Sequence, residues 1–295
     1  MQNRNESRTK SSLSRLIERI PVPIKAIVVG IVVYAIGSFP SLAAISFLPL
    51  PFSIIVLFLF LFLYVKYFSG RWGDESSSSV RSRTENFRSI KLTGSVWAWG
   101  VTGALLFVVV LQSIFVVTFR VFEYDPDVMM TFQLGDLPLW YLWLAAIASA
   151  LIAGVSEEIG FRGYMQTPLA TRYRPWVANV IVSVVFVLFH LNQGWAQPAL
   201  YGLLFVGSFM LGLLATASGS LIPSIIAHFV VDIFNFGYWW SDIAGEFEHR
   251  PISETGIDTH FLVWVAVLVS SLLLFLLATR KTESERLRST AAEMA

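Results

Sequence analysis

The sequence predicts an all-α fold, a polytopic membrane bundle of about eight transmembrane helices. Of its 295 residues, 55% are hydrophobic and only 14% are charged, whereas soluble domains carry roughly 25% charged residues. The charged side chains are concentrated at the two ends and in a few loops, which leaves long stretches without charge. An apolar run of about 18 residues or more can cross a bilayer core of roughly 30 Å. The composition therefore indicates an integral, multi-pass membrane protein.

Eight apolar runs could form these spans. They cover residues 23–43, 52–68, 95–119, 138–166, 176–192, 198–217, 219–240 and 260–279. The fourth run is long and carries charged residues near its far end. Six or seven spans plus a re-entrant segment would fit the same runs.

The basic residues predict how the chain is oriented in the membrane. Segments rich in Lys and Arg are residues 1–25, 66–92, 163–175 and 280–288, and acidic loops occupy residues 123–136 and 242–258. Cytoplasmic loops carry an excess of Lys and Arg. Eight spans with both termini in the cytoplasm place every basic segment inside and both acidic loops outside. The expected location is the plasma membrane of a prokaryote.

The chain divides into four segments. They are a basic cytoplasmic segment (1–22), N-terminal transmembrane helices (23–137) with a flexible Ser/Arg-rich loop (70–93), a core (138–240), and a last part (241–295) with the outer acidic loop, the last transmembrane helix and a cytoplasmic tail. The first 20 residues fit either an amphipathic surface helix or a solvated tail. The chain has no cysteine, which excludes disulfides, cysteine catalysis and thiolate metal sites.

Ionisable residues are rare within the apolar runs. Six of them lie in the core segment: Glu157, Glu158, Arg162, His190, His228 and Asp232. Such groups cost several kcal/mol at bilayer depth unless they are paired or solvated, so each is a candidate functional residue. A spacing of four residues places Glu158 and Arg162 on one helix face, where they can pair. His228 and Asp232 have the same spacing.

Estimated depths bring ionisable residues from three helices together. At a rise of about 1.5 Å per residue, Glu157 and His228 lie roughly 15 Å and His190 roughly 21 Å from the inner ends of their helices. The estimate assumes that the fourth helix continues through Gly160 and Gly163. A carboxylate and two imidazoles at similar depth predict a hydrolytic site. Water could be activated by the carboxylate or by a metal, and an imidazole could stabilise an oxyanion.

Three short motifs occur in order on three apolar segments. Residues 157–163 read EEIGFRG, residues 186–190 read FVLFH, and residues 228–232 read HFVVD. They resemble the EExxxR, FxxxH and HxxxN/D motifs of the CAAX protease and bacteriocin-processing family of intramembrane proteases. The resemblance covers roughly residues 138–240, about a third of the chain.

The resemblance implies a role for each motif residue. Glu157 would be the base that activates water, and Glu158 and Arg162 would support it structurally. His190 would help to hold the water, and His228 would bind water or stabilise the oxyanion. These roles predict an endopeptidase that uses Glu/His-activated water.

Asp232 would act together with His228, and it stands where many family members have asparagine. An aspartate is a weaker hydrogen-bond donor to an oxyanion unless it is protonated. The family is often described as metalloproteases, and Glu157, His190 and His228 would be the ligands if Zn²⁺ is required. The HExxH motif is absent, and this set is one ligand short of a standard zinc site. Metal-dependent and metal-free mechanisms both stay open.

The leading hypothesis is thus a peptidase that cuts membrane-associated or lipidated (CAAX-type) proteins or peptides. Its partners would be the lipid bilayer and a protein or peptide substrate, with no nucleic acid, and the sequence leaves the oligomeric state open. A proton-coupled transporter is an alternative, because intramembrane carboxylates and histidines also relay protons. A non-catalytic membrane scaffold of the same fold is a third hypothesis.

Overall fold

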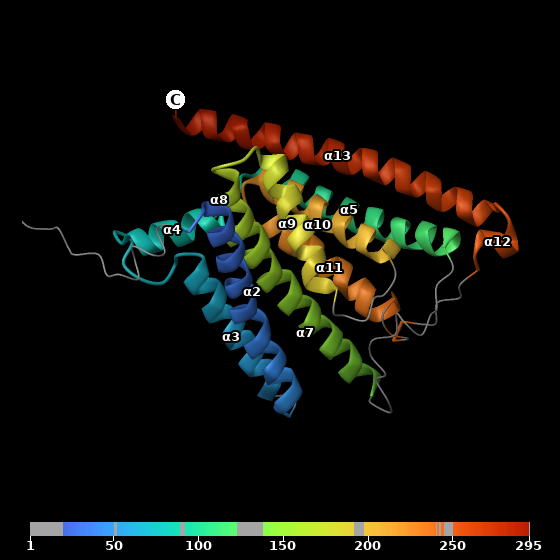
Figure 1. The fold of residues 1–295 in the computed structure, drawn as a ribbon, viewed down its shortest axis with the longest axis horizontal. Helices are drawn as coiled ribbons and strands as arrows, with labels where there is room; N and C mark the ends of the chain where they lie inside the picture. The colour runs from blue at the N-terminus through green and yellow to red at the C-terminus, as the bar shows by residue number, and fades with distance from the viewer. Residues whose placement is uncertain are drawn as a thin grey trace, which may run out of the picture.

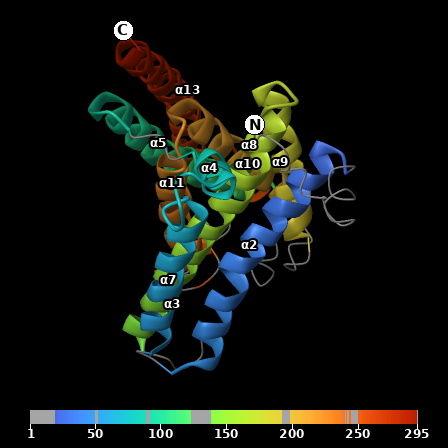
Figure 2. The ribbon, with the colours of Figure 1, turned by 90° about the vertical axis from the view of Figure 1, so that its left-hand side faces the viewer.

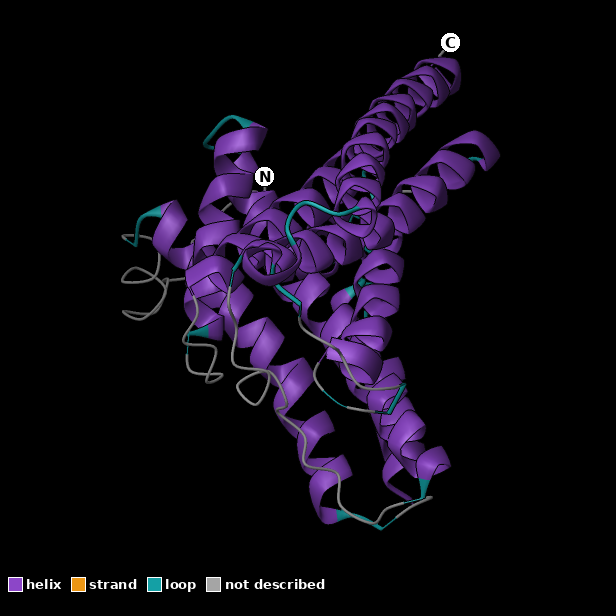
Figure 3. Ribbon diagram, turned by 90° about the vertical axis from the view of Figure 1, so that its right-hand side faces the viewer, coloured by secondary structure: helices purple, strands orange, loops and turns teal. Residues whose placement is uncertain are grey.

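The computed structural model describes residues 20–49, 52–88, 92–122, 138–191, 198–239, 241, 243–244 and 250–294. Within these ranges the regular structure is helical and contains no strand (Figure 3). The predicted all-α membrane bundle is therefore confirmed. The expectation of a surface helix or a solvated tail at the N-terminus concerns residues that lie outside the described ranges, apart from Ile20.

Each predicted apolar run forms a helix. The elements are α2 (Val22–Phe47), α3 (Phe52–Phe68), α4 (Ser78–Phe87), α5 (Gly94–Val121), α7 (Leu139–Glu157), the π-helix η1 (Glu158–Gln166), α8 (Thr167–Ala170), α9 (Pro175–His190), α10 (Pro198–Ser218), α11 (Ile222–Phe234), the π-helix η2 (Asn235–Trp239), α12 (Ile252–Thr255) and α13 (Thr259–Met294). Among the described residues, 5 helices are long and apolar enough to cross a membrane, and α3 and α9 are shorter apolar helices. The predicted number of eight spans is not confirmed.

The helices converge at one end of the molecule and diverge toward the other in two groups (Figures 1 and 2). One group contains α2, α3 and α7, and the other contains α5, α10 and α13. Helix α11 packs against both α7 and α5 and so joins the two groups. The π-helix η1 continues α7 and packs against α2 and α9. Segments from both groups thus meet around the junction of α7 and η1.

Helix α2 crosses η1 at a close contact between two glycines. A Cβ atom added at Gly30 would lie 2.6 Å from the Cβ of Met165 and 2.9 Å from the carbonyl oxygen of Gly160. A Cβ atom added at Gly160 would lie 2.7 Å from the Cβ of Tyr34. Small residues let helix backbones approach closely inside a membrane. This crossing fixes η1, which carries part of the candidate site, against the N-terminal helices.

The segment 70–93, expected to be a flexible loop, contains a helix. Ser77 caps the start of α4 by accepting a hydrogen bond from the backbone N–H of Val80 at 3.1 Å. Val80 is buried, and Arg83 donates hydrogen bonds to the carbonyl oxygens of Tyr67 and Trp72. The expectation was wrong because the Ser/Arg-rich composition conceals an N-cap and a buried apolar residue.

Arg120 links the end of α5 to the segment that precedes α13. Its Nη2 lies 2.8 Å from Oδ2 of Asp258 and donates to Oγ1 of Thr255 at 2.8 Å. Its Nη1 lies 2.7 Å from Nδ1 of His260. The hydrogen bond from Arg120, together with one from the N–H of Phe261, holds the pKa of the Asp258 carboxyl below its ordinary value. This carboxylate therefore stabilises the fold in a pH-dependent way.

The contact between Arg120 and Asp258 predicts a loss of stability in acid. A carboxyl whose pKa is lower in the folded state stabilises the fold above its unfolded value of about 3.9. That stabilisation is lost as the pH falls through the lower folded value. We expect Asp258→Asn to lower the thermal unfolding midpoint at neutral pH and to flatten its decline between about pH 5 and pH 3. Thermal unfolding in detergent measures both effects. An unchanged profile, or the same change in the exposed control variant Glu75→Gln, would contradict the assignment.

Candidate active site

The junction of α7 and η1 positions two adjacent glutamates. Glu157 is the last residue of α7, and Glu158 is the first residue of η1. The helix continues through Gly160 and Gly163, as the depth estimate assumed, but it does so with π-helical geometry. Short π-helical segments within α-helices are frequent at functional sites. Both carboxylates are buried here.

Glu158 and Arg162 form the buried ion pair that their spacing predicts. Nη1 of Arg162 lies 3.0 Å from Oε1 of Glu158, and both side chains are 0% exposed. This contact is an ion pair without the alignment of a hydrogen bond, and among the described residues Nη1 of Arg162 has no hydrogen-bond partner. Nη2 of Arg162 donates to both the carbonyl oxygen and the hydroxyl of Ser208 on α10, each at 2.9 Å. The guanidinium also lies over the ring of Phe186 at 5.0 Å from its centroid. Arg162 thus ties η1 to α9 and α10.

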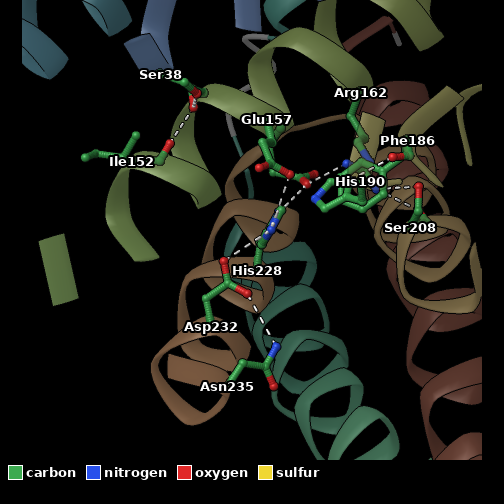
Figure 4. A network of polar contacts seen from close by, with 12 residues as sticks. Ser38, Ile152, Glu157, Arg162, Phe186, His190, Ser208, His228, Asp232 and Asn235 are labelled. Carbon is green, nitrogen blue, oxygen red and sulfur yellow. Dashed lines mark hydrogen bonds and ion pairs between the residues drawn. The ribbon is translucent and has the colours of Figure 1, made fainter. Parts of the chain in front are cut away.

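His228 on α11 lies among three carboxyl groups. Its Nδ1 lies 2.8 Å from Oε1 of Glu158. Its Nε2 lies 3.8 Å from Oε2 of Glu157 and 3.5 Å from Oδ2 of Asp232 (Figure 4). Because Glu158 is ion-paired with Arg162, its carboxylate accepts the Nδ1–H of the imidazole. Nε2 is then the ring nitrogen that faces Glu157 and Asp232.

One carboxylate oxygen of Glu157 has no hydrogen-bond partner among the residues that the structure describes. The residue is 8% exposed. Its Oε2 makes no hydrogen bond within the described part of the chain, and its contact with Nε2 of His228 is too long for a direct one. A buried polar atom left unpaired in this way is uncommon and often marks a functional site. The free lone pairs of Glu157 can accept a proton from water.

His190 lies beside the site, and the ring of Phe186 contacts both His190 and His228. Its Nδ1 lies 2.7 Å from the carbonyl oxygen of Phe186, one turn earlier on α9. The imidazole stacks on the ring of Phe186, with 4.3 Å between centroids, and the same ring lies 6.4 Å from that of His228 (Figure 4). In the described ranges, no hydrogen bond or ion pair joins His190 to Glu157. The structure therefore brings together five of the predicted residues directly and places His190 beside them.

The three side chains that the resemblance suggests as metal ligands do not converge on one point. Within the described ranges, no group of three or more His, Cys, Asp and Glu side chains is placed to hold a metal ion. Nδ1 of His228 is hydrogen-bonded to Glu158, and Nδ1 of His190 is hydrogen-bonded to the backbone carbonyl of Phe186. Among the described residues, the predicted ligands Glu157, His190 and His228 thus do not form a three-donor cluster.

Four polar residues of the site region were missed by the sequence reasoning. Ser208 binds Arg162, and Asn235 donates to Asp232. Gln112 on α5 binds Asn235 and the indole of Trp239. A search for ionisable residues passes over uncharged amides, so polar amides within apolar runs are the signal that could have found two of them. Trp239 is buried, and its indole N–H donates to Oε1 of Gln112 on α5.

The segment that carries the candidate site matches a known protein family. The family model for type II CAAX prenyl endopeptidases (Rce1-like) matches residues 138–234. The matched segment contains all six candidate site residues and the three motifs. No curated protein and no solved structure matches the chain significantly. The match confirms the resemblance drawn from the motifs: over residues 138–234, the chain is similar to type II CAAX prenyl endopeptidases and is consistent with a CAAX protease and bacteriocin-processing family intramembrane protease.

Proposed function

We propose that this protein is an intramembrane endopeptidase that hydrolyses lipidated, CAAX-type or other membrane-associated peptides with water activated by Glu157. The observation that carries the proposal is the unpaired carboxylate oxygen of Glu157 beside Nε2 of His228. His228 is itself held by Glu158, and Glu158 is held by Arg162. A base with free lone pairs next to a fixed hydrogen-bond donor is the arrangement that peptide hydrolysis needs.

In the proposed first step, Glu157 removes a proton from a water molecule as the water attacks the scissile carbonyl. The carbonyl π-bond opens, and negative charge develops on its oxygen. His228 in its imidazolium form donates Nδ1–H to Glu158 and directs Nε2–H toward this oxyanion. A fixed donor of this kind favours the transition state because it needs no reorganisation during the reaction.

In the second step, the tetrahedral intermediate collapses and the C–N bond breaks. Glu157 returns the proton to the leaving amine, so that one water is consumed and a carboxylic acid and an amine are formed. Arg162 takes no part in proton transfer. Its role is to keep Glu158 ionised and in place, and thereby to orient His228.

The substrate class follows from the family description and from the location of the site. The matched family is described as prenyl endopeptidases. The site lies on helices with many exposed apolar side chains, including Ile147 on α7, Leu188 on α9 and Phe234 on α11. An attached lipid would be compatible with such surfaces in the bilayer. Neither a transporter nor a scaffold is specifically favoured by the described contacts.

A peptide panel tests the proposal. Purified protein in detergent would be incubated with one peptide in farnesylated, geranylgeranylated and unprenylated forms, and the released fragments would be identified by mass spectrometry. We expect cleavage at a single bond and at least about a tenfold preference in kcat/KM for a prenylated form, since each buried CH₂ contributes about 0.8 kcal/mol. Equal cleavage of all forms would overturn the lipid preference. No cleavage of any form by folded protein would overturn the peptidase.

A further inference from the structure

Two arginines from distant parts of the sequence meet at the C-terminal end of α10. Arg88 follows α4, and Arg286 lies in the polar last part of α13. Nη1 of Arg88 donates to Oγ1 of Thr216 at 3.5 Å, at the outer limit of a hydrogen bond. Nε of Arg286 donates to the carbonyl oxygen of Ala217 at 2.9 Å. Because these two acceptors belong to consecutive residues in the last turn of α10, the two guanidinium groups are neighbours.

Neutral oxygen atoms hold both guanidinium groups and leave most of their N–H groups unused. Nε of Arg88 donates to Oγ1 of Thr167, the first residue of α8, at 2.8 Å. In the described part of the chain, Nη2 of Arg88 and both Nη atoms of Arg286 have no hydrogen-bond partner. Neither side chain is fully buried, so these donors can reach a molecule from outside. Basic side chains often bind the last carbonyl groups of a helix, but this role uses only one N–H of Arg286.

No carboxylate neutralises this pair of arginines among the residues that the structure describes. Glu158 acts on Arg88 through space, but it is already paired with Arg162. Glu285 of α13 is paired with Arg288 at 2.8 Å. Two like charges that are partly removed from water cost free energy unless a counter-ion approaches them. The pair therefore favours the binding of an anion.

The environment of Arg88 agrees with the need for a counter-ion. Burial of its guanidinium and the positive charge of Arg286 lower the pKa of Arg88 to about 10. Arg88 thus keeps its charge at neutral pH. Its backbone is in the left-handed region, with φ 53° and ψ 55°, and no other non-glycine residue in the described ranges has a positive φ. Glycine or asparagine usually takes this place after a helix, and an arginine takes it at a steric cost.

The pair lies at the edge of the apolar part of the molecule. Helix α10 ends at Ser218, next to both arginines. In α13, residues 260–279 contain no Lys, Arg, Asp or Glu, and charged residues begin at Arg280. Basic pockets between helices at a membrane surface bind the phosphate head groups of lipids. Guanidinium groups suit this role because their N–H groups match the oxygens of a phosphate.

We propose that Arg88 and Arg286 form a binding site for a phosphate group, which bridges the two guanidinium groups at the end of α10. A tetrahedral oxyanion has enough acceptor oxygens for N–H groups from both side chains. In a bilayer the group is the phosphate of an anionic lipid head group, and free phosphate offers the same chemistry. The bound phosphate links the segment after α4 to α13 through α8 and α10. This binding is separate from the proposed peptidase reaction.

Thermal unfolding with two phosphate probes tests the site. Purified, delipidated protein would be kept in a maltoside detergent, which contains no phosphate, and phosphatidylglycerol would be added to the micelles. In a separate arm, inorganic phosphate would be compared with chloride at equal ionic strength. We expect at least one probe to raise the unfolding midpoint by at least about 3 °C. A shift with the lipid alone identifies the head group as the ligand, and a shift with inorganic phosphate shows that the free ion binds.

Matched double variants separate this site from a general attraction between charges. Arg88→Gln combined with Arg286→Gln should abolish the shift and lower the apparent affinity for the effective probe at least about tenfold. Arg81→Gln combined with Arg280→Gln removes the same charge from exposed positions on α4 and α13, and this control should keep the shift. If the first double variant does not fold, Arg88→Gly removes one guanidinium, suits the left-handed backbone and should still weaken binding.

Three results would overturn the inference. One is an unshifted wild-type midpoint with both probes, and another is an equal loss of the shift in the control double variant. The third is unchanged lipid and phosphate binding in the Arg88→Gln/Arg286→Gln or Arg88→Gly variant. If that variant also has a raised KM for the panel peptide, the pair binds a substrate carboxylate instead. Because binding is measured without substrate, a wild-type protein that cleaves no peptide would overturn the proposed function and leave this test intact.

Discussion

Replacing Glu157 with glutamine is expected to lower kcat/KM by roughly 10²- to 10⁴-fold, the range for loss of a general base. Glutamine has almost the same shape as glutamate, but its amide cannot accept a proton from water at neutral pH. The fold should survive, because Oε2 of Glu157 makes no hydrogen bond to the described residues that the substitution would break. Initial rates on the cleaved peptide of the panel, measured at equal protein concentration, give the effect.

The matched control is Glu75→Gln, which changes an exposed carboxylate outside the site in the same way. This variant should cleave at the wild-type rate. Thermal unfolding of both variants separates a loss of chemistry from a loss of structure. A Glu157→Gln variant that is folded and retains most of the activity would exclude Glu157 as the base.

Replacing Arg162 with methionine is expected to destabilise the protein by about 3–5 kcal/mol, the cost of removing one partner from a buried ion pair. Arg162 and Glu158 are both fully buried, so the substitution leaves a carboxylate without its counter-charge in the interior. The hydrogen bonds to Ser208 are lost as well. Thermal or denaturant unfolding in detergent measures the change.

A second substitution separates the stability role of this pair from its role in positioning. Combining Arg162→Met with Glu158→Leu removes both charges, and such double replacements often restore most of the stability. Activity should stay low, because Nδ1 of His228 has lost its acceptor. An Arg162→Met variant as stable as wild type would show that the ion pair is not the buried link described here. A double variant with wild-type activity would show that His228 does not depend on Glu158.

Much of the fold could be predicted from hydropathy alone, because each of the eight runs is apolar. The predicted runs correspond to α2, α3, α5, α7 with η1, α9, α10, α11 with η2, and α13. The number of spans could not be settled in this way, since length and composition do not determine how a short helix such as α3 or α9 is placed in a bilayer. The helix α4 was missed because a single buried side chain, Val80, holds a polar segment in place.

The pairs within the candidate site that are local in sequence were also predictable. A spacing of four residues on a helix was enough to place Arg162 on Glu158, and their contact is 3.0 Å. The same spacing placed Asp232 beside His228. The partner of Nδ1 of His228 depends on how α11 packs against the junction of α7 and η1. Spacing alone could not show that Glu158 binds this nitrogen and leaves Glu157 free.

The hydrogen bonds that connect Trp239, Gln112, Asn235 and Asp232 were not predictable either, because they depend on how the helices pack. Gln112 is one uncharged residue within an apolar helix, and it acquires a role only because α5 packs against α11. Trp239 lies next to Trp240 in the sequence, a pattern that resembles an aromatic belt at a membrane interface. Packing, rather than composition, turns this indole inward.

The most direct test of a Glu157-activated water is a single-turnover cleavage measurement. Wild type, Glu157→Gln and His228→Ala would be mixed in excess with a prenylated peptide in the same detergent, with and without a strong zinc chelator, and product would be quantified over time. We expect product from wild type in both conditions and a rate lower by at least about 10²-fold for each folded variant. Cleavage by Glu157→Gln at the wild-type rate would contradict it.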